Sequence, residues 1–419
     1  MLSNGLLFSG VSVGLRHAVG AAGKAFALQN AFREALAAYA VADELEPGNA
    51  SIKQMISEVT EKARSVPSCD PALTGHLMCW GANDKGACGT GDRKDRSGPR
   101  GVLWLGTPPS KVLDISCGLA HTVIIAHGIC GGATQAWSWG GNSHGQCGVG
   151  VRGDDILAPR LIKGLLGKNP VAVACGAGHN VVLTESGSAY SFGVGGYGSL
   201  GLGDGTREAL VPTRMGARAV LGVKLVGVAC GIGHTILTDD KGVTFAVGWN
   251  KHGQCGMGPA ATESLFEVHP VPKLHGENVR HVACGGAHTL YVLDSGAVLA
   301  CCSNSCGQLG MGDNCDRLAP EPIPSLSGSH SAMAGCGEEF SVVVTADRRV
   351  FAFGLNNVGQ LGCGDTTNRS VPCEVDPLRS LRIGLLACGQ GTSAPFRFGS
   401  RANALPCLEA AIRRLSRGC

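Results

Sequence analysis

The sequence predicts an all-β protein built from repeated small sheets, and three observations lead to this fold class. Glycine makes up 65 of the 419 residues, about twice its usual frequency. A Cys-Gly pair recurs along the chain at intervals of 58, 55, 54, 52 and 52 residues. Short apolar runs alternate with turn sequences throughout the same region. Abundant glycine with many short strands and regular turn signals is typical of sandwiches, barrels and propellers.

The composition excludes several broad classes of protein. The formal net charge is +3 and only 16% of the residues are charged, so no large basic field for nucleic acid or anionic lipid is predicted. No apolar run reaches the roughly 18 residues of a membrane span. The 20 cysteines sit in a long chain without a clear signal peptide, which favours a reducing compartment, the cytoplasm or the nucleus. Residues 1–26 lack acidic residues, so a mitochondrial presequence or a signal peptide is the alternative.

The repeated Cys-Gly pairs could belong to catalytic or metal-binding sites, or they could be structural. A histidine follows four of the six cysteines at the same distance, and Phe340 and Thr392 fill that position in the last two repeats. Such a pair could be a thiolate–imidazole couple or half a metal site, but neither is needed six times at even spacing. Small cysteines and neutral histidines suit buried packing positions. The predicted structural positions are Cys117, His121, Cys175, His179, Cys230, His234, Cys284, His288, Cys336 and Cys388.

Each repeat reads as one unit of antiparallel sheet. The apolar runs "VVLT", "TILT", "TLYVL" and "SVVVT" are ended by the turns "ESG", "DDKG", "DSG" and "ADRR". A second strand, a glycine-rich corner such as "NKHGQCGMG", and a link containing a proline follow each turn. Strand, turn, strand and link at a period near 50 residues are typical of a propeller blade of four antiparallel strands.

The pattern "ACGxxHT…LT…G…Y.WG.N..GQLG.GD" resembles the regulator of chromosome condensation repeat family, over residues 75–396. The resemblance implies a β-propeller, usually of seven blades. Six Cys-Gly pairs predict six blades here, or seven if one repeat has lost its signature. Two repeats depart from the pattern: "LACCSN" has Cys301 and Cys302 in place of the aromatic residue and glycine, and "FAVGWN" shifts its tryptophan to Trp249.

The two ends of this region predict how the ring closes. Residues 75–92 match only the second half of a repeat, and residues 385–394 match only the first half. Together they would form one composite blade, which removes the open sheet edges that invite aggregation.

Residues 16–66 have a different, helical periodicity. Residues at the signature positions of one tetratricopeptide repeat are Gly23, Phe26, Phe32, Ala35, Tyr39, Ala42 and Pro47. The resemblance implies a small α-helical hairpin, and residues 50–64 read as a capping helix. Because about three repeats are needed for a stable array, either these helices pack on the propeller or more repeats precede Met1. Residues 1–15 are unassigned, residues 67–74 form a linker, and residues 397–419 form a basic tail with an amphipathic helix.

Several motifs that suggest chemistry do not fit their context. The dinucleotide-binding pattern at residues 193–198 and the nucleophile-elbow pattern at residues 141–145 both fall on glycine-rich corners, where no helix follows. Four nearby cysteines could bind zinc, but they lack a Cys-x-x-Cys pair, and Cys301 and Cys302 should point to opposite faces of a strand. We therefore predict no catalytic residue, no metal and no cofactor. The cysteines concerned are Cys301, Cys302, Cys306 and Cys315.

Function is expected in the loops, because the propeller fold itself does not choose one. The first full repeat has about five extra residues within positions 126–136, and a link with charged residues follows in the same repeat. The candidate partner-binding residues are His127, Cys130, Thr134, Gln135, Arg152, Asp154 and Asp155.

The resemblance implies several classes of role. The favoured one is a non-catalytic scaffold that binds protein partners through propeller loops and the N-terminal helices. The alternative is guanine-nucleotide exchange on a small GTPase, the activity of the family's founding member on Ran, although no insertion here is long enough for its hairpin wedge. Regulation of ubiquitin ligation ranks below both. A photoreceptor role needs a tryptophan cluster on one face, and the five tryptophans are scattered along the sequence.

Overall fold

A computed structural model of the chain describes residues 77–378, apart from 106–108, 110, 129–131, 217 and 260, together with Cys388 and five positions between 50 and 57. The five N-terminal positions are helical, and the rest of the predicted tetratricopeptide-like region lies outside the described residues. No helix in the described part is long and apolar enough to cross a membrane.

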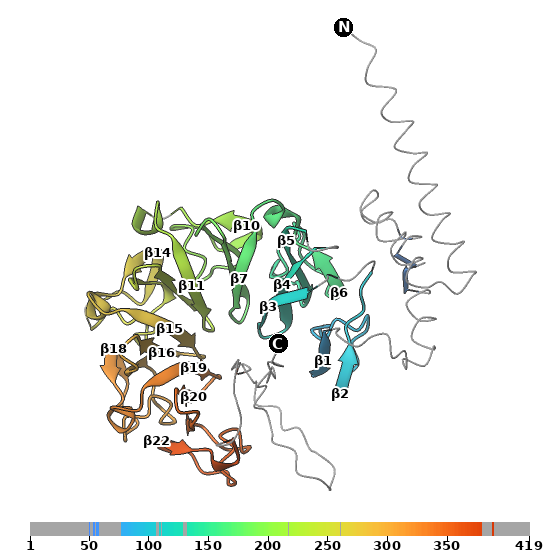
Figure 1. Cartoon of the computed structure of the whole chain (residues 1–419). Coiled ribbons are helices and arrows are strands. Elements are labelled where there is room, and N and C mark those ends of the chain that lie inside the picture. Colours follow the sequence, from blue (N-terminus) through green and yellow to red (C-terminus); the bar gives the residue numbers. More distant parts are fainter. Residues whose placement is uncertain are drawn as a thin grey trace, which may run out of the picture.

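The described chain forms six sheets arranged in a ring (Figure 1). Five of them have four antiparallel strands in sequence order, as predicted for propeller blades. Blade 1 is β3 (Lys111–Cys117), β4 (His121–His127), β5 (Thr134–Gly140) and β6 (Ile156–Leu161). Blade 2 is β7 (Pro170–Cys175), β8 (His179–Thr184), β9 (Ala189–Val194) and β10 (Glu208–Arg214). Blade 3 is β11 (Leu225–Cys230), β12 (His234–Asp239), β13 (Thr244–Trp249) and β14 (Ser264–Pro270).

The remaining elements complete the ring of sheets. Blade 4 is β15 (Val279–Cys284), β16 (His288–Leu293), β17 (Val298–Cys302) and β18 (Arg317–Pro322). Blade 5 is β19 (Ser331–Cys336), β20 (Phe340–Thr345), β21 (Val350–Gly354) and β22 (Arg369–Glu374). The sixth sheet pairs β1 (Met78–Gly81) with β2 (Arg96–Gly101). Short 3-10 helices follow the outer strands: η3 (Lys163–Leu165), η4 (Arg218–Val220), η5 (Pro272–Leu274), η6 (Pro324–Leu326) and η7 (Asp376–Leu378).

The β1–β2 sheet is the second half of a blade, as predicted from residues 75–92, because it contains the glycine-rich corner between its two strands. Of the segment predicted to supply the first half, Cys388 alone is described, and it packs against the hydrophobic cluster of blade 5. The composite blade therefore remains a proposal, while the six-bladed propeller is the fold of the chain.

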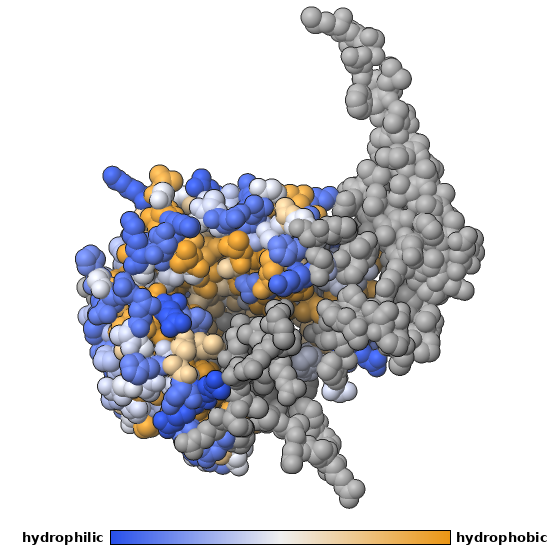
Figure 2. All heavy atoms as spheres, viewed as in Figure 1, coloured by the Kyte–Doolittle hydropathy of each residue, from blue (hydrophilic) through white to orange (hydrophobic). Residues whose placement is uncertain are grey.

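The core lies between successive blades. Inner strands lie toward the middle of the ring and outer strands at its edge (Figure 1). The second strands of blades 2 to 5 are buried along their whole length, as in β12 and β16. Each of five hydrophobic clusters joins two neighbouring sheets; one of them joins Ile236 of blade 3 to Tyr291 of blade 4. Figure 2 shows hydrophobic residues toward the middle of the ring and mostly hydrophilic ones along its outer edge.

The prolines of the predicted links correct the sequence interpretation. Four of the five lie inside the outer strands β6, β10, β18 and β22, and Pro272 begins η5. An outer strand has an unpaired edge, so a residue without an N–H group is tolerated there. The segments that we expected to be links are therefore the fourth strands themselves.

One asparagine holds the glycine-rich corner in blades 1, 3, 4 and 5 and in the β1–β2 sheet, whereas blade 2 has Gly195 at that position. In blade 4 the Asn304 carbonyl oxygen accepts a hydrogen bond from Leu309 N at 2.9 Å, and its amide donates to Asp313 O at 2.9 Å. The Asp313 carboxylate accepts from Cys315 N at 3.0 Å and pairs with Arg317 at 2.7 Å. The Asp313 side chain thus bonds a nearby backbone amide, as aspartates in glycine-rich turns commonly do.

Candidate functional site

The propeller has two ends that differ in their loops. We call one end the Cys-Gly face; it carries the turns after the inner strands and the glycine-rich corners between the third and fourth strands. The opposite end, the hairpin face, carries the turns between the second and third strands and the links to the next blade. The strand pairing separates the two faces, because His121 pairs with Gly140 at one end of β4 and His127 pairs with Thr134 at the other.

Each Cys-Gly-x-x-His turn is closed on itself. In blade 3, Gly231 N donates to His234 O at 2.9 Å. The imidazole folds back over the glycine so closely that a Cβ on Gly231 would lie 2.1 Å from His234 Cε1 and 2.6 Å from Gly285 O of the next turn. Glycine is required at this position because no side chain fits between the ring and the neighbouring blade.

The histidine also links its blade to the next one. His234 Nε2 lies 3.1 Å from Thr289 Oγ1 in blade 4, and that hydroxyl donates to Gln254 O in the corner of blade 3 at 3.1 Å. Since the hydroxyl proton goes to the carbonyl, the imidazole must donate its Nε2 proton. The same contact joins His121 to Asn180 (2.7 Å), His179 to Thr235 (2.9 Å) and His288 to Ser341 (2.9 Å).

These histidines are neutral at physiological pH. Burial lowers the pKa of His121, His179 and His288 to about 4 and that of His234 to about 3. All four side chains are excluded from solvent. Because a general acid or base must reach a substrate proton, the arrangement favours a fixed hydrogen-bond donor between blades over a catalytic group.

The cysteines of the repeat make contacts between inner strands. Cys230 Sγ lies 3.5 Å from Ala174 O of the preceding blade, and Cys336 Sγ lies 3.5 Å from Ala283 O. Burial raises the pKa of Cys230 and Cys388 to about 12. Such thiols are poor nucleophiles and poor metal ligands, because both roles need the thiolate.

Among the repeated cysteines, Cys117 departs most from the predicted burial, and Cys388 is partly exposed. Cys117 is exposed, whereas Cys175, Cys230, Cys284 and Cys336 are buried. The buried cysteines lie between the inner strands of two blades. The sheet before blade 1 consists of β1 and β2, and in the described part of the chain no inner strand precedes β3. Cys117 therefore lacks, among the described residues, the neighbouring strand that covers the other cysteines.

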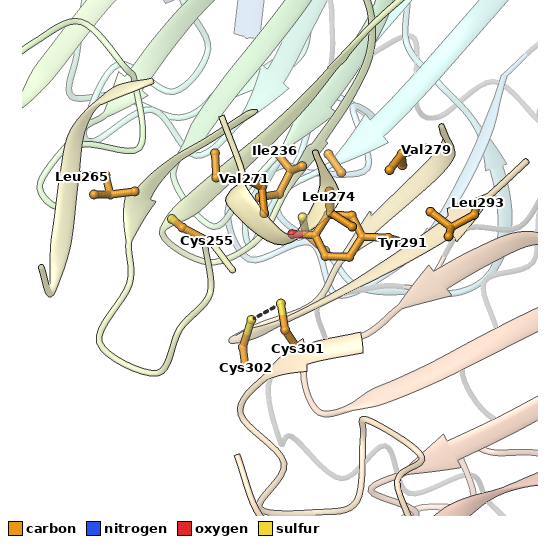
Figure 3. Close-up of a cluster of buried hydrophobic side chains, with 13 residues drawn as sticks. Ile236, Cys255, Leu265, Val271, Leu274, Val279, Tyr291, Leu293, Cys301 and Cys302 are labelled. Carbon is orange, nitrogen blue, oxygen red and sulfur yellow. Dashed lines mark hydrogen bonds between the residues drawn. The ribbon is translucent and has the colours of Figure 1, made fainter. Parts of the chain in front are cut away.

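Cys301 and Cys302 correct a prediction about the cysteine-rich segment. They were expected on opposite faces of a strand, but Figure 3 shows the two side chains next to each other, with 2.9 Å between the Sγ atoms. The reason is the backbone of Cys302, which has φ +92° at a position that is glycine with positive φ in the other blades, such as Gly248 and Gly354. Cys306 and Cys315 lie nearer the surface, and no group of three metal ligands occurs among the described residues.

The predicted partner-binding residues fall into two groups on opposite faces. His127, Thr134 and Gln135 belong to the β4–β5 hairpin on the hairpin face, where His127 Nδ1 lies 3.3 Å from Gly132 O. Cys130, from the same hairpin, lies outside the described residues. Part of the extra sequence lengthens the strands, because β4 and β5 have seven residues each and β8 and β9 have six.

The other group lies on the Cys-Gly face and joins neighbouring blades. Arg152 Nη1 lies 2.8 Å from Glu208 of blade 2, and Asp155 lies 2.9 Å from Arg93 in the β1–β2 sheet. Asp154 is exposed beside them. The two groups are separated by the length of a strand, so they do not form one site.

The sequence analysis missed an aromatic cluster on the Cys-Gly face. The rings of Tyr197 and Trp249 are stacked with 5.5 Å between centroids and 28° between planes, and His252 meets Trp249 edge-on at 5.7 Å. The shifted position of Trp249 in "FAVGWN" was the one available signal. Trp104 and Trp137 form a separate edge-on pair near blade 1, at 6.0 Å, so the tryptophans do not gather in one place.

Comparison with known proteins places this fold and its repeat in a family. The model of the RCC1-like domain matches residues 68–394. The chain belongs to the RCC1-like domain family. It is 32% identical to the ultraviolet-B receptor UVR8 of Arabidopsis thaliana, over 76% of this chain and 70% of the receptor. It is 29% identical to the mitochondrial RCC1 domain-containing protein RUG3 of the same plant, over 79% of this chain and 77% of RUG3.

A solved structure supports the fold of the RCC1-like propeller. Yeast RCC1 (Prp20), in its complex with Kap60, superposes with a TM-score of 0.63 at 20% identity, and the match covers 75% of this chain and 74% of the yeast chain. At 20% identity, this superposition is evidence for a shared fold alone. What the relatives bind does not pass to this chain through the fold, because the loops set binding.

The Cys-Gly turn leads to a first prediction. Gly231→Ala should lower the free energy of unfolding by about 1–3 kcal/mol, because the added methyl group collides with His234 and with the next blade. Gly216→Ala is the matched control, since a Cβ added at Gly216 would have no neighbouring atom within 4 Å. Denaturant unfolding followed by circular dichroism checks both, and equal stabilities of the two variants would contradict the close packing described above.

The buried histidines predict a loss of stability in mild acid. The unfolded chain binds protons below pH 6.5, whereas the folded RCC1-like propeller resists protonation until about pH 4, so stability present above pH 6.5 is lost as the pH falls. Each histidine contributes about 1.4 kcal/mol per pH unit in this window. His288→Phe should reduce the slope of stability against pH by one proton, and Phe340 shows that a phenyl ring fits the equivalent position. An unchanged slope would count against the neutral imidazole.

We expect exposed and buried cysteines to differ sharply in their reactivity toward alkylating reagents. In the native protein iodoacetamide should modify the exposed Cys315 within minutes and should leave Cys230 and Cys302 unmodified until unfolding, because burial raises the pKa of both of these thiols. Peptide mass spectrometry at intervals measures the three rates. Modification of Cys302 as fast as Cys315 would show that the cluster in Figure 3 opens readily to solvent.

Proposed function

We propose that the RCC1-like propeller is a non-catalytic protein-interaction scaffold. The observation that carries this proposal is the contrast between its buried and exposed side chains. The repeated histidines bond within the ring, whereas apolar side chains on the Cys-Gly face are exposed: Leu119 by 52% and Tyr197 by 55%. Exposed apolar groups among polar neighbours are typical of protein-binding surfaces.

The proposal extends to the ends of the chain. The tetratricopeptide-like helices of residues 16–66 would supply a second recruiting surface, and residues 385–394 would complete the blade begun by β1 and β2. The 16 cysteines of the described part form no disulfide, which supports a reducing compartment such as the cytoplasm or nucleus. The alternative is a mitochondrial presequence in residues 1–26, and the similarity to mitochondrial RUG3 supports it.

Guanine-nucleotide exchange on a small GTPase is the second candidate. It is favoured by the lengthened β4–β5 hairpin on the hairpin face. The fold also resembles that of Prp20p, whose structure was reported with its binding properties to Gsp1p and histones. That resemblance has 17% identity and a TM-score of 0.52, so the hairpin is the feature of this chain that carries the alternative.

Nucleotide release separates the two candidates. We expect the full chain to leave the release of a fluorescent guanine nucleotide from a panel of small GTPases unchanged within about twofold, because no insertion reaches the length of a wedge. An acceleration of about tenfold on any one GTPase would establish exchange. In that case His127→Ala with Gln135→Ala should abolish it, and Asp154→Ala on the opposite face should not.

A further inference from the structure

Blade 3 differs from its neighbours in the place of its tryptophan. In blades 1, 2 and 5 the aromatic residue before the third-strand glycine is buried, namely Trp139, Phe192 and Phe353. In blade 3 Val247 fills that buried position, and Trp249 lies two residues further on, at the Cys-Gly face. The core therefore does not require Trp249. Its stack with the 55% exposed Tyr197 places two aromatic rings where a partner can reach them.

The aromatic pair continues into an apolar strip toward blade 5. Trp249 and Tyr197 close over Gly233, where an added Cβ would lie 3.3 Å from Trp249 Cβ and 3.5 Å from Tyr197 Cδ2. The preceding residue, Ile232, is 36% exposed and reaches toward Gly286 of the next turn. An added Cβ on Gly286 would lie 3.2 Å from Ile232 Cδ1 and 3.1 Å from Glu338 Cγ. Ile232 and Glu338 thus flank the same glycine from two sides.

The far end of the strip is acidic. Glu338 and Glu339 occupy the Cys-Gly turn of blade 5, whereas the turns of blades 1 to 4 carry apolar or small residues. Burial and the neighbouring charge of Glu339 raise the pKa of Glu338. Among the described residues neither carboxylate forms an ion pair, although the Cys306 thiol lies 3.7 Å from Glu339 Oε2. Asp316 adds a third carboxylate, 3.6 Å from His252. The exposed cations beside the strip, Arg207 and Lys251, lie in the corners of blades 2 and 3, so carboxylates predominate at the end toward blade 5 and favour a cation there.

We propose that this aromatic–acidic strip, formed by Tyr197, Ile232, Trp249, His252, Glu338 and Glu339, binds an extended basic segment of a partner protein. An arginine fits both ends best, because its planar guanidinium group stacks on aromatic rings and pairs with carboxylates through two hydrogen bonds. Ile232 receives an aliphatic side chain between the two cationic groups. The inference rests on the proposed scaffold function, for which it names the chemistry of the partner.

Selection from a display library of random nine-residue peptides on the full chain tests the proposal, with the Trp249→Ala protein as the counter-selection. The expected result is enrichment of peptides with two basic residues, mainly arginine, on either side of an apolar one. Enrichment of acidic or purely apolar peptides would overturn the proposal, and so would the absence of any enriched peptide.

Variants locate the binding site of the best peptide by fluorescence anisotropy. Trp249→Ala should weaken binding at least about tenfold, as expected for a central aromatic residue of an interface. Tyr197→Ala repeats the test at a more exposed position in case Trp249→Ala unfolds. Glu338→Gln with Glu339→Gln should weaken binding about three- to tenfold, and replacing arginine by citrulline in the peptide should do the same. Trp80→Ala, which removes a tryptophan that is 48% exposed elsewhere, is the matched control and should change nothing.

Three further outcomes separate this proposal from its alternatives. If Arg413→Gln, Arg414→Gln and Arg417→Gln together raise the affinity about tenfold, the strip is occupied by the basic tail of this chain, and the partner assignment is wrong. If the peptide binds but the protein also accelerates nucleotide release, the strip stands and the scaffold function fails. If protein partners are captured by a chain whose strip binds no basic peptide, the scaffold stands and this inference fails.

Discussion

The ring depends on the neutral imidazole that joins one blade to the next. Each hydroxyl or amide that receives it also donates to a carbonyl in the glycine-rich corner of the histidine's own blade, as Thr289 does between His234 and Gln254. One side chain therefore fixes three segments: a Cys-Gly turn, a corner and the second strand of the next blade. Apolar packing between sheets is non-directional, so these buried polar contacts set the register of neighbouring blades.

The same contact explains why the Cys-Gly turn and the corner recur together. The turn needs glycine because the imidazole lies on it. An asparagine side chain holds the corner in blades 1, 3, 4 and 5, and in blade 2, where Gly195 replaces it, Ser199 O still accepts from Thr235 of the next blade. In blade 5 Phe340 replaces the histidine of the repeat. The contact with blade 4 is kept, because Ser341 donates to Gln308 O at 2.8 Å. Cys302 shows the other limit, since a side chain at a glycine position is accommodated with φ +92°.

The sequence predicted the blades, their number and the burial of the repeated histidines and of most repeated cysteines, because each of these features recurs with a period near 50 residues. It misplaced features that depend on contacts between repeats or on local backbone strain. The prolines were assigned to links because nothing in the sequence marks an outer strand. Tyr197 and Trp249 are far apart in the sequence and touch through the ring, so their stack has no local pattern. The candidate partner-binding residues were grouped by sequence, whereas the blade separates them onto two faces.

A propeller of near-identical units obtains specificity from departures from its own repeat. The Cys-Gly turns share one backbone and one hydrogen-bond pattern, so the side chains that differ among them determine what each part of that face contacts. Gly178 and Gly286 add no side chain to this face. Ile232 and Trp249 add apolar side chains in blade 3, and Glu338 and Glu339 add carboxylates in blade 5. Because the backbone hydrogen bond of the turn is the same whether histidine or Phe340 follows, these residues can vary without altering the ring, and this independence of surface from scaffold is what a binding function requires.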